Sequence, residues 1–348
     1  MPGELNAYAG AKGPARCDTS PMGAHTSADA PVVGDIQALL HRYGVRADRI
    51  RRVPKSDCEI LRISAGAREL QCRIYAPGRL ERGAIDTELD WLQLAADDGL
   101  RVPRPLVDHA GLRVMCWQPP GAALPRCAVL LSWLAGRQLD RGLDVARLKQ
   151  VGKLIGRLHG VATRLVEAGL VQTQREAQPL DLHRWAAGGR AGSQRLCAAH
   201  RQILQAAASR LMPLLAAPAP RRFIHGDLHQ WNLVFRGREA GAIDFTDCGW
   251  GDPAMDLAST LQYLKLPLAG NHDHRAQYPA LRDALFEGLI GEQPLADGLA
   301  ERVDVLITAR LFLTLEWMLD DWPHLSHRAW GPGFLRGQQR ALRDWMEA

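Results

Sequence analysis

Three oxygen-bearing side chains lie close together in the middle of the chain. Asp227 and Asn232 belong to one polar loop, and Asp244 follows a short turn and an apolar pair. Apolar residues on both sides of the loop predict short strands, so the three side chains should converge at one end of a small hairpin. A carboxylate can accept or orient the proton of an attacking hydroxyl, while an amide oxygen and a second carboxylate suit magnesium. The set indicates phosphoryl transfer from a nucleotide, with Asp227 catalytic and Asn232 and Asp244 as metal ligands.

The flanking residues extend this set into a longer pattern. It consists of His225-Gly-Asp227, Asn232, Ile243-Asp-Phe245 and Gly251-Asp-Pro-Ala-Met-Asp-Leu-Ala258. This pattern resembles the aminoglycoside phosphotransferase family, the kinase-like small-molecule kinases that include choline, homoserine and fructosamine kinases. The spacing from Asp227 to Asn232 also matches the protein-kinase catalytic loop, although Gly226 stands where protein kinases carry an arginine.

The resemblance covers the chain from Val32 to at least Leu264 and implies a fold. We expect an α+β, bilobal, protein-kinase-like fold with a small β-rich N-terminal lobe and a larger, mostly helical C-terminal lobe. Residues 1–31 are rich in Gly, Ala, Ser and Pro, and are predicted to form a disordered tail. Residues 32–133 should form the nucleotide-binding lobe with its hinge, and residues 134–348 the catalytic and acceptor-binding lobe.

Hydrophobic periodicity predicts the elements that position the site. Strands are expected at residues 50–54, 58–64 and 70–75, followed by a helix over residues 83–96. A further strand is expected at residues 112–117 and an apolar strand at 129–136. Strongly amphipathic patterns predict helices over residues 145–165 and 194–215, with a loop-rich insert at 179–193 between them.

The resemblance also implies a nucleotide site in the first lobe. Arg73, on the third strand, would bind the α- and β-phosphates of ATP, and Glu88 would be its partner. Each could instead be an exposed surface residue. The backbone of Leu131, Ser132 and Trp133 would face the adenine, the alternative being a buried strand without a ligand.

The first hairpin departs from the kinase pattern. No glycine lies between Arg52 and Ile63, so Pro54-Lys-Ser-Asp57 would replace the usual glycine loop. Ser56 and nearby backbone amides are then candidate phosphate donors. Because of this departure, a catalytically idle nucleotide-binding protein is an alternative. A metal-dependent hydrolase using the His-x-Asp-x-His spacing from His225 is another, although the sequence lacks a second metal-binding motif.

Several further residues are expected to support the site or to bind the acceptor. Asp256 resembles a family aspartate that braces the catalytic loop, Asp252 could cap the following helix, and His159 is expected to be a core residue. A carboxylate patch that could bind a cationic acceptor such as an aminoglycoside comprises Asp247, Glu316, Asp320 and Asp321. Charged residues on a late helix can equally face solvent.

Composition narrows the class of protein. The chain has 348 residues and a net charge of +5 from dispersed arginines, which does not indicate nucleic-acid binding. Seven cysteines, an odd number without a CxxC pair, argue against a complete disulfide framework and favour a reducing cytoplasm. No apolar run has membrane-spanning length.

The predicted cofactors are ATP and Mg²⁺, and the predicted partner is a small-molecule hydroxyl acceptor. The sequence does not indicate an oligomeric state.

Overall fold

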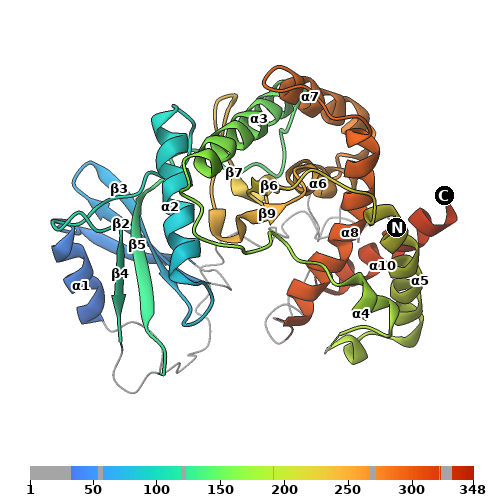
Figure 1. Cartoon of the computed structure of the whole chain (residues 1–348), viewed down its shortest axis with the longest axis horizontal. Helices are drawn as coiled ribbons and strands as arrows, with labels where there is room; N and C mark the ends of the chain where they lie inside the picture. Colours follow the sequence, from blue (N-terminus) through green and yellow to red (C-terminus); the bar gives the residue numbers. More distant parts are fainter. Residues whose placement is uncertain are drawn as a thin grey trace, which may run out of the picture. The chain divides into compact units, whose positions relative to one another are not determined.

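The computed structural model describes residues 33–53, 58–118, 123–190, 192–266, 272–320, 322 and 331–348. The predicted tail at residues 1–31, together with Ser56 and Asp321, lies outside these residues. The chain divides into two compact units, coloured from blue to teal and from green to red in Figure 1. We call Ala15–Ala135 with Glu167–Thr173 the β-rich unit, and Gly136–Val166 with Gln174–Ala348 the helical unit.

The β-rich unit contains a five-stranded sheet in the order β1-β2-β3-β5-β4. Its strands are β1 (Arg49–Val53), β2 (Cys58–Ala65), β3 (Arg68–Tyr75), β4 (Val114–Trp117) and β5 (Arg126–Ser132). All four neighbouring pairs are antiparallel. The first three strands agree with the predicted ones to within a few residues, while β5 ends at Ser132, before the predicted end at Gly136.

The alternation of side chains along β3 separates the two faces of this sheet. Leu70, Cys72 and Ile74 belong to an apolar core that includes the buried residues of α1 (Val33–Arg42). Arg73 and Tyr75 have the opposite parity and contact Glu88 of α2 (Arg82–Asp97). The strand pattern therefore places the Arg73 side chain on the face of α2, away from the main apolar core of the unit.

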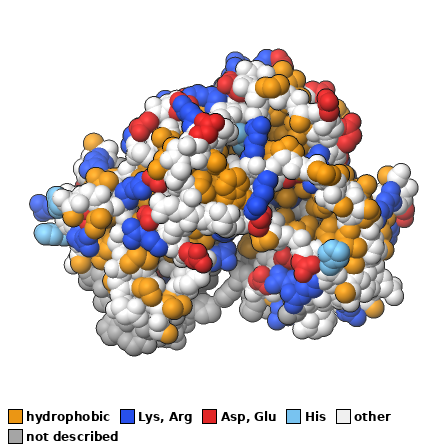
Figure 2. All heavy atoms as spheres, viewed as in Figure 1, with side chains coloured by type: hydrophobic (Ala, Val, Ile, Leu, Met, Phe, Trp, Pro, Cys, Tyr) orange, Lys and Arg blue, Asp and Glu red, His pale blue; other side chains and the backbone are white. Residues whose placement is uncertain are grey.

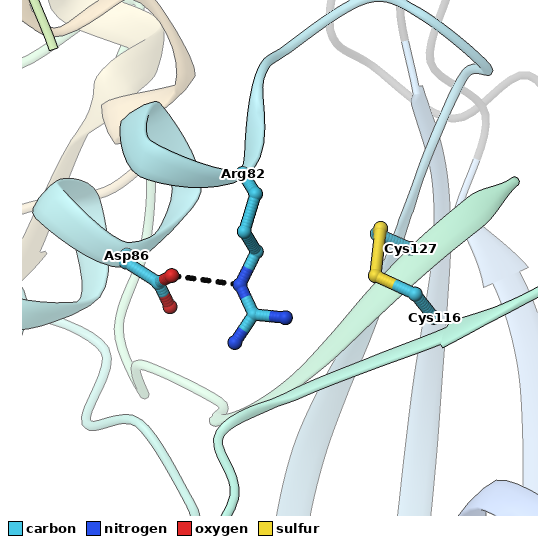
Figure 3. Close-up of a disulfide and its surroundings, with 4 residues drawn as sticks. All are labelled: Arg82, Asp86, Cys116 and Cys127. Carbon is cyan, nitrogen blue, oxygen red and sulfur yellow. Dashed lines mark hydrogen bonds and ion pairs between the residues drawn. A yellow bond between two sulfur atoms is a disulfide. The ribbon is translucent and has the colours of Figure 1, made fainter. Parts of the chain in front are cut away.

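A disulfide joins Cys116 of β4 to Cys127 of β5 (Figure 3). The two residues are direct partners in the antiparallel register, with Cα atoms 4.1 Å apart. The odd cysteine count argued against a complete disulfide framework but did not predict this pair. The reason is the register of β4 and β5, which the sequence pattern alone did not reveal.

The helical unit is built from helices joined to two small strand pairs (Figure 1). The helices are α3 (Val145–Glu167), α4 (Leu182–Ala186), α5 (Ala198–Leu215), α6 (Ala254–Lys265), α7 (Tyr278–Ile290), α8 (Leu299–Asp320) and α10 (Gly331–Glu347). Residues 193–195 form a separate 3₁₀ turn, so α5 begins four residues later than predicted at residue 194. The predicted loop-rich insert contains the short helix α4.

Two sets of packing contacts hold the helices of this unit together. The backbones of α3 and α7 approach closely, since a Cβ added at Gly152 would lie 2.0 Å from the Leu285 carbonyl oxygen. An apolar core joins α5, α8 and α10 and includes Trp185 and Phe312. Within the described part of the chain, every helix is too short or too polar to span a lipid bilayer. On the face shown in Figure 2, basic and acidic side chains alternate without a large patch of one sign.

Candidate active site

A strand pair brings two of the predicted site residues to one end. β7 (Leu233–Arg236) and β8 (Glu239–Ala242) pair antiparallel, with Leu233 opposite Ala242. The Ile243 N–H then donates to the carbonyl oxygen of Asn232 at 2.9 Å, one residue beyond the ladder. Asn232 and Asp244 therefore leave the hairpin from the same end, as the sequence pattern predicted.

Asp227 reaches this end through the loop that follows β6 (Arg222–Ile224). The Asn232 side-chain amide donates to the Asp227 carbonyl oxygen at 2.8 Å. Because the nitrogen of the amide is used in this bond, its oxygen remains for a cation. The structure thus brings Asp227 and Asn232 into direct contact.

The geometry at Asp244 fits a cation ligand. Its backbone is left-handed, with φ 68°, a conformation that non-glycine residues adopt at an energetic cost and that is enriched at functional sites. The Thr246 hydroxyl donates to Asp244 Oδ1 at 2.8 Å and orients the carboxylate. With the Asn232 amide oxygen, this carboxylate supplies the hard oxygen ligands that Mg²⁺ prefers.

Each carboxylate oxygen of Asp227 lies near a basic side chain, Arg310 for one oxygen and His229 for the other. Arg310 Nη2 donates to Oδ1 at 2.7 Å, and His229 Nε2 lies 3.4 Å from Oδ2. Burial acts to raise the pKa of Asp227, but His229 and Arg310 outweigh it and the pKa is lowered. Burial has the opposite effect on His229, whose pKa is lowered. Asp227 is therefore a carboxylate at neutral pH, held by the Arg310 guanidinium.

Asp256 braces the catalytic loop from α6. Its Oδ1 accepts the Gly226 N–H at 2.8 Å and its Oδ2 the His225 N–H at 3.1 Å. His159 of α3 lies 2.9 Å from the same Oδ2 and is 2% exposed. Burial acts to raise the pKa of Asp256, but the hydrogen bond from His159 and nearby charges outweigh this effect, and the pKa is lowered. The predicted support role of Asp256 and the core position of His159 are confirmed.

Asp252 has the helix-capping role that was predicted. Its Oδ1 accepts the N–H of Ala254, the first residue of α6, at 2.9 Å. Its Oδ2 pairs with Arg302 of α8 at 2.7 Å. Asp252 therefore fixes the start of the helix that carries Asp256.

Arg310 was missed in the sequence analysis. It is 2% exposed and lies on α8, more than eighty residues beyond the aspartate it contacts. A weak signal was present, because Arg310 is the single charge within the mostly apolar stretch Leu306–Leu315. A buried charge of this kind requires a partner of opposite charge, but the sequence pattern did not identify that partner.

The nucleotide-binding candidates lie in the β-rich unit. Arg73 Nη1 donates to Glu88 Oε1, and the Tyr75 hydroxyl donates to Glu88 Oε2 at 3.1 Å. The side chains of Arg73 and Glu88 are each 1% exposed, so the alternative of an exposed arginine and a solvated glutamate does not hold. The pair expected from the resemblance is formed.

The predicted hinge is partly occupied by bonds within the same unit. The Ser132 N–H donates to the Arg104 carbonyl at 2.8 Å, and the Trp133 N–H donates to the Glu69 carbonyl at 2.9 Å. Leu131 is fully buried and pairs with Gln71 of β3. These two N–H groups hold the segment in place, so an adenine contact would fall to other backbone groups near Trp133.

Arginines of the chain itself pair with the carboxylates of the expected patch. Arg190 pairs with Asp320 at 2.6 Å and lies 3.8 Å from Glu316, which also accepts the Trp185 indole N–H at 2.7 Å. Burial raises the pKa of Glu316. Asp247 pairs with Arg175 at 3.1 Å. These described carboxylates bind arginines of the protein, contrary to the open acidic surface considered from the sequence.

No cluster of three or more His, Cys, Asp or Glu side chains suited to a metal occurs among the residues that the structure describes. His225, the first residue of the hydrolase spacing, is fully buried, and its Nε2 lies 3.1 Å from the Ile243 carbonyl oxygen. Its ring packs on Phe245 with centroids 4.5 Å apart. His225 therefore supports the hairpin, and the hydrolase alternative gains no support.

A β-rich unit, a helical unit, and an aspartate, an asparagine and a second aspartate around one strand pair fit a kinase-like phosphotransferase. A family model described as the phosphotransferase enzyme family matches residues 50–300. The chain belongs to this family of kinases, which transfer a phosphoryl group to hydroxyl groups of small molecules.

Individual similar proteins agree with the fold. An amicoumacin kinase, solved with AMP-PNP, Ca²⁺ and its antibiotic, has a TM-score of 0.74 at 16% identity over 90% of this chain and 93% of that one. A microcompartment-associated aminopropanol kinase has a TM-score of 0.72 at 20% identity over 91% of this chain and 98% of that one. A Deinococcus radiodurans protein described as uncharacterized is 26% identical, covering 88% of this chain and 87% of its own length.

Proposed function

We propose that this kinase transfers the γ-phosphate of ATP, bound with Mg²⁺, to a hydroxyl of a small molecule. The observation that carries the proposal is the hairpin end at which Asn232 contacts Asp227 and Asp244 emerges beside them. Carboxylate and amide oxygens in this arrangement suit an acceptor hydroxyl and a nucleotide-bound cation. The alternative of an idle nucleotide-binding protein would not require this arrangement.

Each residue then has a defined task. Asp227 orients the acceptor hydroxyl and receives its proton as the acceptor oxygen forms a bond to the γ-phosphorus. The bond from that phosphorus to the bridging oxygen breaks, and ADP leaves with the electron pair. Asn232 and Asp244 would hold Mg²⁺, which when bound offsets the negative charge of the phosphates.

The β-rich unit would bind the nucleotide. The Arg73 guanidinium, fixed by Glu88, is the proposed contact of the α- and β-phosphates. The segment Leu131–Trp133 is the proposed adenine hinge, through backbone groups other than the N–H groups of Ser132 and Trp133, which are already bonded. Ser56 is the proposed donor in place of a glycine loop. Because ATP is an intracellular substrate, the proposed use of ATP favours a cytoplasmic location.

The charges of the helical unit bear on the acceptor. Because Arg190 and Arg175 already pair with the carboxylates considered for a cationic ligand, a polycationic aminoglycoside has less to bind there than the sequence suggested. We therefore favour a metabolite or antibiotic with few positive charges. The kinases of similar fold act on amicoumacin and aminopropanol, which are useful first compounds to test.

A coupled assay of ADP release with Mg-ATP tests the proposal. The acceptor panel should include 1-amino-2-propanol, amicoumacin, spectinomycin, kanamycin, choline and homoserine. We expect one compound to accelerate ADP release, and Asp227→Asn to abolish that acceleration while the Kd of Mg-ATP stays within about twofold. ATP binding without any ADP release would instead support the idle alternative, and full activity of Asp227→Asn would contradict the catalytic assignment.

A further inference from the structure

The catalytic loop cannot carry a cation immediately before its aspartate. Gly226 has φ +84°, and a Cβ added there would lie 2.7 Å from the backbone carbonyl oxygen of Asp247. Both the conformation and the space exclude a side chain. An arginine at this position, as in protein kinases, is therefore sterically incompatible with this hairpin.

Arg310 of α8 brings a guanidinium to the same point from a distant part of the chain. Nη2 donates to Asp227 Oδ1 at 2.7 Å, and Nη1 donates to the Gly226 carbonyl oxygen at 3.3 Å. Nε donates to Gln262 Oε1 of α6 at 2.9 Å. Three acceptors on two elements therefore fix the plane of one buried guanidinium.

This arrangement distinguishes the two oxygens of the Asp227 carboxylate. Oδ1 is bonded to Arg310, whereas Oδ2 lies at the longer distance of 3.4 Å from His229. The Asp227 side chain is 23% exposed, while that of Arg310 is 2% exposed. The carboxylate is therefore held from its buried side, and its other oxygen remains for a ligand.

We propose that Arg310 is a positioning residue, which holds Asp227 so that Oδ2 receives the proton of the acceptor hydroxyl. This inference rests on the proposed function. Arg310 lies outside the residues 50–300 that match the family model, so the family motifs do not assign it. It does not touch the acceptor. It acts by preventing rotation of a carboxylate that must be oriented before transfer occurs.

Gln262 provides a second way to test this role. Its side chain is fully buried and holds Arg310 Nε. Gln262→Met would loosen the guanidinium without removing its charge. We expect a smaller loss of kcat for Gln262→Met than for Arg310→Met, because only one of three fixing bonds is lost.

The experiment must separate positioning from stability, since removing one member of a buried ion pair is destabilising by itself. Arg302 supplies a matched control. It lies on the same helix and pairs with Asp252, just before α6, through an N–O distance of 2.7 Å, the same as for Arg310 and Asp227. Arg302→Met removes an ion pair between α8 and the residue that caps α6 but leaves Asp227 untouched.

The measurement is the kcat of ADP release at saturating Mg-ATP, with the best acceptor of the panel, or water if no acceptor is found. We expect Arg310→Met to lower kcat by about 100-fold and to leave the Kd of Mg-ATP within about twofold. Arg302→Met should stay within about twofold of the wild type in kcat. Millimolar guanidinium should restore part of the activity of Arg310→Met, with NaCl as the salt control.

Arg310→Lys covers the case in which Arg310→Met does not fold. Lysine keeps the charge but loses the planar fork, so a folded Arg310→Lys enzyme should retain Mg-ATP binding and lose kcat. Wild-type kcat in Arg310→Lys would overturn the inference, as would equal losses in Arg310→Met and Arg302→Met. A wild type without any ADP release would contradict the proposed function itself, which distinguishes the two failures.

Discussion

His159 Nε2 of α3 lies 2.9 Å from Asp256 Oδ2, and the same oxygen accepts the N–H of His225 in the catalytic loop. A helix distant in sequence thereby orients the carboxylate that holds the loop. The arrangement is buried, since His159 and Asp256 are 2% and 1% exposed. Its polar groups therefore depend on one another for their hydrogen bonds.

Asp256→Ala should destabilise the protein strongly. The change leaves two loop N–H groups and His159 without their acceptor, so we expect the free energy of unfolding to fall by about 3 to 5 kcal/mol. Urea unfolding measures this loss. Asp252→Ala is the control, because it removes a more exposed carboxylate from the start of α6 and should cost only about 1 to 2 kcal/mol. Equal losses of unfolding free energy in the two variants would contradict the bracing role of Asp256.

Asp244→Ala should weaken the binding of nucleotide through the metal. Calorimetry of ATP with and without Mg²⁺ should show that Mg²⁺ increases affinity in the wild type and that the variant loses more than about tenfold of this gain. Asp247→Ala, which removes a neighbouring carboxylate paired with Arg175, is the control. A variant that kept the full Mg²⁺ dependence would remove Asp244 from the metal site.

Stability should depend on pH through His200 of α5. Burial lowers the pKa of this side chain, and its hydrogen bond with Gln338 only partly opposes the effect. At this histidine the unfolded chain therefore binds a proton more readily than the folded chain does. The contribution of neutral His200 to stability is fully present above about pH 6.5 and is lost as the pH falls through the folded pKa. Urea midpoints at pH 7.5 and 5.5 should differ less for His200→Leu than for the wild type. Equal differences would rule out this contribution.

The disulfide should stabilise the β-rich unit. It closes a loop with a sequence separation of 11 residues, which by chain entropy corresponds to about 3 kcal/mol. Dithiothreitol should lower the Tm of the wild type to that of the Cys116→Ser, Cys127→Ser double variant. The double variant should not respond to the reductant. A wild-type Tm unchanged by complete reduction would contradict the prediction.

The parts of the site that the sequence predicted depend on short-range geometry. Asp227, Asn232 and Asp244 lie on one loop and one hairpin, so their spacing and the strand register determine where they meet. The pairing of Arg73 with Glu88 came from the family resemblance, and alternation along β3 is consistent with it. For both sets of residues, the local strand and loop geometry allows few alternative contacts.

The contacts that the sequence did not predict join distant segments. Arg310 reaches Asp227 from α8, and Arg190 pairs with Asp320 and lies near Glu316 from a loop far from them in sequence. Cys116 and Cys127 pair because β4 and β5 align in one register among several possible ones. Helical periodicity gives the face of a residue, but it does not give the partner that packs against that face.

The left-handed backbone of Gly226 has a consequence for the assembly of the enzyme. Because the loop cannot supply its own cation, Asp227 depends on Arg310 of α8, which the ribosome adds more than eighty residues later. A nascent chain that has emerged as far as residue 300 already contains every recognisable motif, yet it lacks Arg310. Efficient catalysis would then require α8 to be synthesised, because a chain that stops before this helix lacks the contact that positions Asp227.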